Sequence, residues 1–140
     1  MRMSRFLMAA GLAVFVGVAS ITVLSAQSKT DEDYDKLMKA VGAANGAMRG
    51  AAKESNTAGI TAEAAKMAAL FKDAQAFWTA RNNAEAAEWA GAAMKHADAI
   101  AKATDPAAAM GAMKELGGTC MTCHTKYREK TESGFVIKKG

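Results

Sequence analysis

The sequence predicts an all-α protein whose main part is an antiparallel four-helix bundle. Ala occupies 29 of the 114 positions from 27 to 140, and Ala is the residue most favourable to helix. Pro, the least favourable, occurs only at Pro106. Apolar residues recur at helical spacing in four segments, each bounded by signals for helix ends. Helices of roughly 20 residues, each about 30 Å long and joined by short turns, pack antiparallel.

The first two helices are predicted from their caps and apolar positions. The first is expected to begin near Thr30, because the acidic residues that follow suit the positive end of a helix dipole, and to end near residues 53–56. The second is expected to begin with Thr61 as its cap and to end before a turn at 81–83. The inward positions would be Tyr34, Leu37, Met38, Val41 and Met48, then Met67, Leu70, Phe71, Ala74, Phe77 and Trp78.

The third helix is expected to follow Asn82, because Asn82 and Glu85 resemble a capping box. Many inward positions of the bundle are Ala, which buries little apolar area. Such a bundle either packs very closely or surrounds something large. The inward positions of the third helix would be Ala86, Trp89, Ala93, Ile100 and Ala101.

The fourth helix begins at the strongest boundary in the chain, Asp105 before Pro106. Asp accepts the free amide hydrogens of a first helical turn, and Pro has none to leave unsatisfied. This helix is expected to run to about Lys130. The prediction is therefore one helical domain at 27–130, followed by a flexible tail at 131–140.

Residues 1–26 form a separate unit that is typical of a signal peptide for export. Arg2 and Arg5 precede an apolar stretch, and small residues precede the polar run that follows it. Cleavage is expected after Ala26, with a cut after Ala19 as an alternative. The apolar stretch is about as long as the roughly 20 residues that span a bilayer, so an uncleaved anchor is the competing interpretation. We expect a periplasmic protein, associated with the membrane only if this leader is uncleaved.

The net charge gives weak support to nucleic-acid binding. The chain has 18 Lys and Arg against 14 Asp and Glu, a net charge of +4. Without Arg2 and Arg5 of the leader, 16 against 14 leaves +2. The remaining charges alternate in sign and form no basic stripe, so we expect no nucleic-acid partner.

Residues 120–124 carry the pattern C-x-x-C-H, which is the attachment sequence for a c-type haem. Two thiols add to the two vinyl groups on one edge of the porphyrin, while the adjacent imidazole must reach the iron. On a helix these positions share one face, so Cys120, Cys123 and His124 would point at one ring. The sequence therefore predicts one covalently attached haem c, with its iron, on the fourth helix.

Other interpretations of the motif explain less. A thioredoxin-like redox pair would need a βαβ pattern that the chain lacks. A structural zinc site needs four ligands, and beyond the motif only His96 is available as a further Cys or His. A disulfide is compatible with an exported protein, but it does not explain the neighbouring His.

The motif's position near the end of an all-helical chain resembles that in the class II c-type cytochromes, the cytochrome c′ family and its Met-ligated low-spin relatives. The stretches 116–128 and 37–48 carry the resemblance. It implies a bundle that holds haem between its helices, with His124 as the proximal iron ligand. Arg128 matches a basic residue common beside the proximal His. It would tune the imidazole or hold a haem propionate, unless it is a solvated surface residue.

The resemblance also bears on the opposite side of the iron. The family places the residue that faces the open iron position in the first helix, and aligning Gly46 with the usual Gly puts Met38 there. A thioether is a soft ligand that raises the reduction potential of haem iron. The alternative is that Met38 only packs, because in cytochrome c′ an apolar residue blocks this position without bonding. Tyr34 stands where many family members have Arg, which puts a propionate contact there in doubt.

The remaining candidates are weaker. His96 lies on the same side of its helix as Trp89, yet it neighbours Lys95 and Asp98, which is more typical of a surface residue than of a ligand. The aromatic residues are expected to surround the macrocycle or to form ordinary core. They are Phe71, Phe77, Trp78, Trp89 and Tyr127.

The resemblance predicts an electron-transfer carrier rather than an enzyme, since no acid/base pair or substrate pocket is recognisable. The alternative function is that of a five-coordinate cytochrome c′, which binds nitric oxide or carbon monoxide. Partners would be periplasmic redox proteins. A homodimer is left open, because dimerisation through the first two helices is common in the family.

Overall fold

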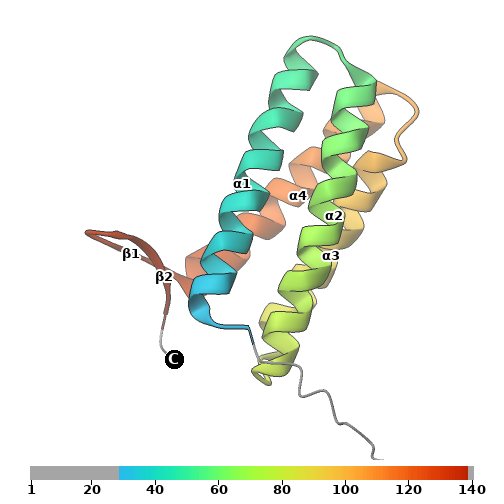
Figure 1. Cartoon of the computed structure of the whole chain (residues 1–140). Coiled ribbons are helices and arrows are strands. Elements are labelled where there is room, and N and C mark those ends of the chain that lie inside the picture. Colours follow the sequence, from blue (N-terminus) through green and yellow to red (C-terminus); the bar gives the residue numbers. More distant parts are fainter. Residues whose placement is uncertain (1–28, 139–140) are drawn as a thin grey trace, which may run out of the picture.

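The computed structural model describes residues 29–138 and confirms the all-α prediction, with four helices followed by a short β-hairpin (Figure 1). The predicted signal peptide lies outside the described residues. No helix within residues 29–138 is long and apolar enough to cross a membrane. The elements are α1 (Asp31–Lys53), α2 (Thr57–Ala80), α3 (Ala84–Ala101), α4 (Pro106–Tyr127), β1 (Arg128–Thr131) and β2 (Gly134–Ile137).

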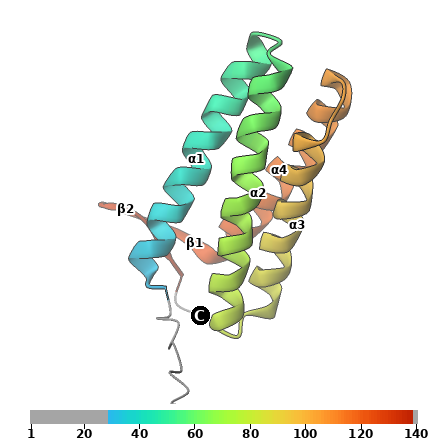
Figure 2. The ribbon, with the colours of Figure 1, turned by 45° about the vertical axis from the view of Figure 1, so that its right-hand side comes forward.

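The helices pack in chain order but do not close into a complete ring. α1 packs along α2, α2 along α3 and α3 along α4, whereas α1 and α4 hardly touch each other. Figures 1 and 2 show α4 slanting behind the other helices rather than lying parallel to α1. The first and last helices therefore do not pack along each other, although their side chains share one core.

The closest packing is between α2 and α3, and Ala makes it possible. Small side chains allow two helix backbones to approach, because helix separation depends on the side chains at the contact. Larger core side chains then fill the layer beside them, with Met48, Met67 and Ile100 almost completely buried. Close packing thus accounts for part of the Ala content. The Ala residues that are no more than 3% exposed are Ala64, Ala74, Ala86, Ala93, Ala97 and Ala109.

Enlarging one of these residues is expected to destabilise the fold. Ala97→Leu should lower the free energy of unfolding by about 1–3 kcal/mol, because Ala97 is 0% exposed and added methyl groups force the helices apart. Ala99→Leu is the matched control, since Ala99 is exposed on the same helix, and should change stability by no more than about 0.5 kcal/mol. Urea denaturation measures both. Equal effects in the two variants would contradict the close α2–α3 contact.

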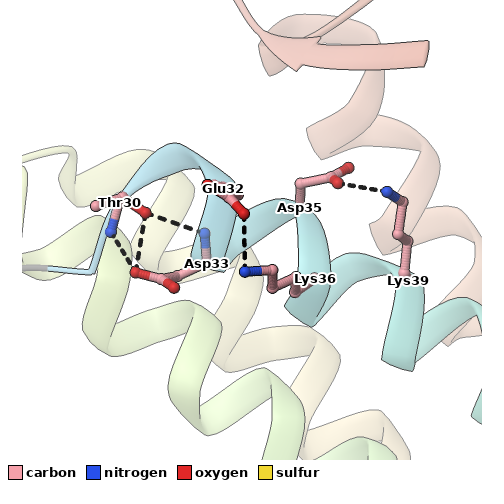
Figure 3. A network of polar contacts seen from close by, with 6 residues as sticks. All are labelled: Thr30, Glu32, Asp33, Asp35, Lys36 and Lys39. Carbon is pink, nitrogen blue, oxygen red and sulfur yellow. Dashed lines mark hydrogen bonds and ion pairs between the residues drawn. The ribbon is translucent and has the colours of Figure 1, made fainter. Parts of the chain in front are cut away.

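The predicted start of α1 is confirmed at Thr30, whose side chain accepts a hydrogen bond from the Asp33 amide while Asp33 accepts from the Thr30 amide (Figure 3). Ion pairs one turn apart follow along the exposed face, Glu32 with Lys36 at 2.8 Å and Asp35 with Lys39 at 2.6 Å. Exposed pairs of this kind contribute only about 0.3–0.5 kcal/mol each, so the cap matters more than the pairs.

Two other helix starts differ from the prediction. α2 begins after Asn56, whose side chain accepts from the Gly59 amide, rather than at Thr61. α3 begins after Asn83 rather than Asn82, because Asn82 adopts a positive φ of 56° in the turn and Asn83 accepts from the Ala86 amide. The start of α4 is as predicted: Asp105 accepts from the Ala108 amide and Pro106 occupies the first turn.

The chain beyond α4 corrects the expected end of the helix and the expected tail. α4 ends at Tyr127 instead of continuing to Lys130, and the next residues form an antiparallel hairpin. The apolar run 135–137 contains aromatic and β-branched residues, which favour strand over helix. Gly134 has a φ of 140°, a conformation that favours Gly, and it permits the reversal.

Candidate functional site

The motif lies on the inward face of α4. Leu116 is 2% exposed, and Cys120, Cys123 and His124 are each half-buried, whereas Met121 and Thr122 between them are exposed. This alternation follows from helical geometry, because residues three and four apart share a face. The sequence predicted that the two thiols and the imidazole lie on one side of the helix, and the structure places them so.

Aromatic rings from all four helices form one cluster at the end of the bundle where α4 ends. The Tyr34 ring stacks on Phe77 with centroids 4.3 Å apart and meets Trp78 edge-on at 5.3 Å. The Trp78 ring lies 5.3 Å from that of Tyr127, which lies 5.9 Å from that of Trp89. Of the aromatic residues expected around the macrocycle or in the core, Phe71 takes no part in these ring pairs.

Tyr34 is the member of this cluster that the sequence analysis did not assign to the site. Its hydroxyl accepts a hydrogen bond of 3.0 Å from Nε1 of Trp78, which fixes the phenol near the start of α1. Burial raises the pKa of Tyr34 to about 12, and the negative charge that Cys123 and Cys120 would carry adds to the rise. Only the helical spacing of Tyr34 signalled a buried position; nothing local linked it to the cysteines.

The end of α4 is tied to the start of α3. The Tyr127 hydroxyl donates to Glu85 at 2.8 Å, and Lys126 forms an ion pair with the same carboxylate. These hydrogen bonds lower the pKa of Glu85, that from Lys126 having the largest effect. The helix that carries the motif is thus held at its last turn by α3.

Burial keeps the motif side chains in their neutral forms. It raises the pKa of Cys120 and raises that of Cys123 to about 11, so both are thiols at neutral pH. Burial also lowers the pKa of His124, and the charge of Arg128 lowers it further. A neutral imidazole has the free nitrogen lone pair that a metal requires.

A zinc site is not assembled in the part of the chain that the structure describes. Among residues 29–138, no group of three or more His, Cys, Asp and Glu side chains could hold a metal ion by themselves. His96, the fourth ligand that such a site would need, is half-buried on α3. Both cysteines are free thiols rather than a disulfide.

Met38 lies one helical turn after Tyr34 on the same face of α1. Its side chain is half-buried and packs against the core. One turn further along, a Cβ built on Gly42 would meet nothing within 4 Å, and the same holds for Gly117 on α4. Gly42 and Gly117 are both exposed, so this free space belongs to the surface of the protein.

Arg128 is exposed, and its guanidinium lies 4.2 Å above the centre of the Phe135 ring. Its backbone amide donates to the carbonyl of His124, so Arg128 ends the helix and begins β1. The hairpin thus determines where this cation lies, which the sequence analysis did not anticipate.

These residues fit a haem c. The donor set is two thiols three residues apart and a neutral imidazole beside the second, on a half-buried face next to aromatic rings. A shallow surface pocket of about 350 Å³ between α2 and α3 contains none of these residues. Comparison with protein-family models, with curated proteins and with solved structures found no match to this chain.

Removing the Tyr34 hydroxyl tests this local geometry. Tyr34→Phe leaves the Trp78 N–H without its acceptor and should lower the free energy of unfolding by about 1–3 kcal/mol at pH 7. The Tyr34 pKa is raised from 10.0 to about 12 on folding, so its contribution is complete below pH 10 and is lost as the pH rises through 12. The difference in unfolding free energy between wild type and variant should therefore be constant up to pH 10 and narrow between pH 10 and pH 12. Urea denaturation across this range measures it, and a gap independent of pH would contradict the buried phenol.

Proposed function

We propose that this protein is a periplasmic, mono-haem c-type cytochrome that carries electrons. The observation that carries the proposal is the joint placement of Cys120, Cys123 and His124 on the inward face of α4, in a bundle whose α1 and α4 do not pack along each other. When bound, haem iron supplies a one-electron couple. An electron carrier of this kind is not an enzyme, and it needs no acid/base pair.

Each motif residue has a distinct role in the proposal. Cys120 and Cys123 hold the group by two thioether bonds. The half-buried imidazole of His124 is held neutral and serves as the proximal ligand. The backbone of α4 is fixed at its first turn by the Asp105 cap and at its last turn by the Glu85 contacts, so these three side chains have little freedom to move apart.

Met38 is the proposed second ligand. Met38 lies on α1, which does not pack along α4. A thioether sulfur suits haem iron and favours its reduced state. Two axial ligands would leave no vacant position for a gas. The partners would then be periplasmic redox proteins, which exchange electrons through the exposed edge of the site. We include Arg128 as a haem-binding residue, because it adjoins His124 and carries a positive charge.

The alternative is a five-coordinate cytochrome c′ that binds nitric oxide or carbon monoxide. One observation favours it: the Met38 side chain already packs against core residues, so it is accommodated without a bond to iron. In this alternative Met38 only limits access to the iron.

The mass of the denatured protein, expressed with its own leader in a host that matures c-type cytochromes, tests both attachment and export. We expect one polypeptide beginning near Gln27 that carries one haem. A polypeptide of bare mass would contradict covalent attachment. One that retains residues 1–26 and fractionates with membranes would instead support the anchored form.

A further inference from the structure

Positive charge is concentrated at the end of the chain that adjoins the motif. Residues 126–140 contain five Lys and Arg against two Glu, whereas residues 27–125 contain 11 Lys and Arg against 12 Asp and Glu. The net charge of +2 on residues 27–140 is thus +3 on the last fifteen residues and −1 on everything before them. Such a separation of charge orients an approaching charged molecule toward the positive end.

One basic side chain of the hairpin, that of Lys130, is exposed and makes no ion pair or hydrogen bond within residues 29–138. Within residues 29–138, Arg128, Lys130 and Lys138 take part in none of the ion pairs, which involve four of the eight Lys residues on the helices. The Lys138 ammonium donates to the carbonyl of Thr125 at 3.1 Å, which anchors β2 to α4. Figures 1 and 2 show the hairpin reaching outward from the end of α4.

Exposed apolar residues lie among these charges. Phe135 is 49% exposed and Val136 is 46% exposed, and the two are adjacent in the chain. Lys130 is the cross-strand partner of Phe135, and Arg128 covers part of the ring. An aromatic centre between cations has the composition of a small interface with a polar rim.

We propose that the C-terminal hairpin is a docking arm for the acidic surface of a protein partner, which it holds beside the haem motif. The proposal rests on the proposed electron-carrier function and names the kind of partner. A contact made by one hairpin belongs to the class of small, transient interfaces. In such interfaces charge speeds association, and a few apolar contacts slow dissociation.

A lipid surface is a poorer occupant. Adjacent strand residues point to opposite faces, so Phe135 and Val136 cannot enter one bilayer together. Val136 is paired with Glu129, whose charge an anionic membrane would repel. An acidic protein surface can contact the face of Lys130 and Phe135 while Glu129 and Val136 remain in water.

The test is an NMR titration of the ¹⁵N-labelled chain, as purified, with flavodoxin as an acidic redox protein, at about 20 mM and about 200 mM salt. We expect shifts confined to the hairpin and the last turn of α4, weakening at higher salt. Lys130→Glu should weaken binding about fivefold, and Phe135→Ala about threefold with unchanged salt dependence. The matched controls are Lys114→Glu and Met110→Ala, exposed positions near the start of α4, which should change binding less than about twofold.

Three results would overturn the docking arm. They are an absence of shifts at low salt, shifts located on other elements, and equal effects of the hairpin and control variants. Binding to phosphatidylglycerol vesicles or self-association through the hairpin, in place of flavodoxin binding, would also overturn it. The visible spectrum of the same sample reports haem separately, so a failed docking arm is distinguishable from a failed cytochrome assignment.

Discussion

Cys123→Ser is expected to abolish covalent haem. Cys123 lies between Cys120 and His124 on the half-buried face of α4, and a serine hydroxyl does not form the thioether that fixes the macrocycle beside the imidazole. A haem-stained denaturing gel should show a band for the wild type and none for the variant. The double variant Cys120→Ser with Cys123→Ser should behave in the same way.

The control for this experiment is Thr122→Ser, a change within the motif at an exposed position that faces away from the two cysteines. It should retain the haem band in full. Circular dichroism should show that all variants keep their helices, since neither cysteine belongs to the most buried core. A stained band at full strength in Cys123→Ser would refute attachment through this motif.

Met38→Ala is expected to convert low-spin iron to high-spin iron and to open the vacated position to carbon monoxide. The physical reason is the loss of the sulfur ligand, which also removes the stabilisation of the reduced state, so the reduction potential should fall. Visible spectra of the oxidised and reduced variant, with and without carbon monoxide, measure the spin state of the iron and the binding of the gas.

Leu37→Ala is the matched control, because Leu37 is a half-buried apolar neighbour on the same turn of α1. It should lose a similar amount of packing while the iron stays low-spin. An unchanged spectrum in Met38→Ala would show that Met38 only packs. A shift to high spin in both variants would attribute the effect to loosened packing of α1.

The features that were predicted correctly from sequence are those encoded locally. Asp105 with Pro106 carries its own capping chemistry, and the C-x-x-C-H spacing defines one helical face without reference to the rest of the chain. For the same reason the helices themselves could be recognised from composition and period. The haem, its ligands and the periplasmic location remain predictions.

The features that were missed depend on contacts between distant segments. Gly59 lies in the first turn of α2 and passes close to α1, since a Cβ there would lie 2.9 Å from the Cβ of Ala51. That close approach cannot be seen in the local sequence. The role of Tyr34 likewise arises from Trp78, which lies 44 positions away.

The hairpin had a local signal that was overlooked. A Ser and a Gly precede the run Phe135, Val136 and Ile137, which is a pattern of turn followed by strand. An isolated hairpin is marginal in water, so the sequence near the terminus favoured a tail. The hairpin forms because β2 is anchored to the bundle. Ile137 packs against the core, and the Lys138 amide donates to the carbonyl of Tyr127 at 2.9 Å.

The most direct test of the proposed electron carrier is the visible spectrum of the purified protein, oxidised and reduced, with carbon monoxide added to the reduced sample. Our account predicts sharp low-spin bands, a weak absorption toward the red end in the oxidised form that is typical of a Met–iron bond, and no response to carbon monoxide. Broad high-spin bands that shift on adding the gas would contradict the carrier and identify a gas-binding cytochrome c′. A spectrum without haem bands would contradict both.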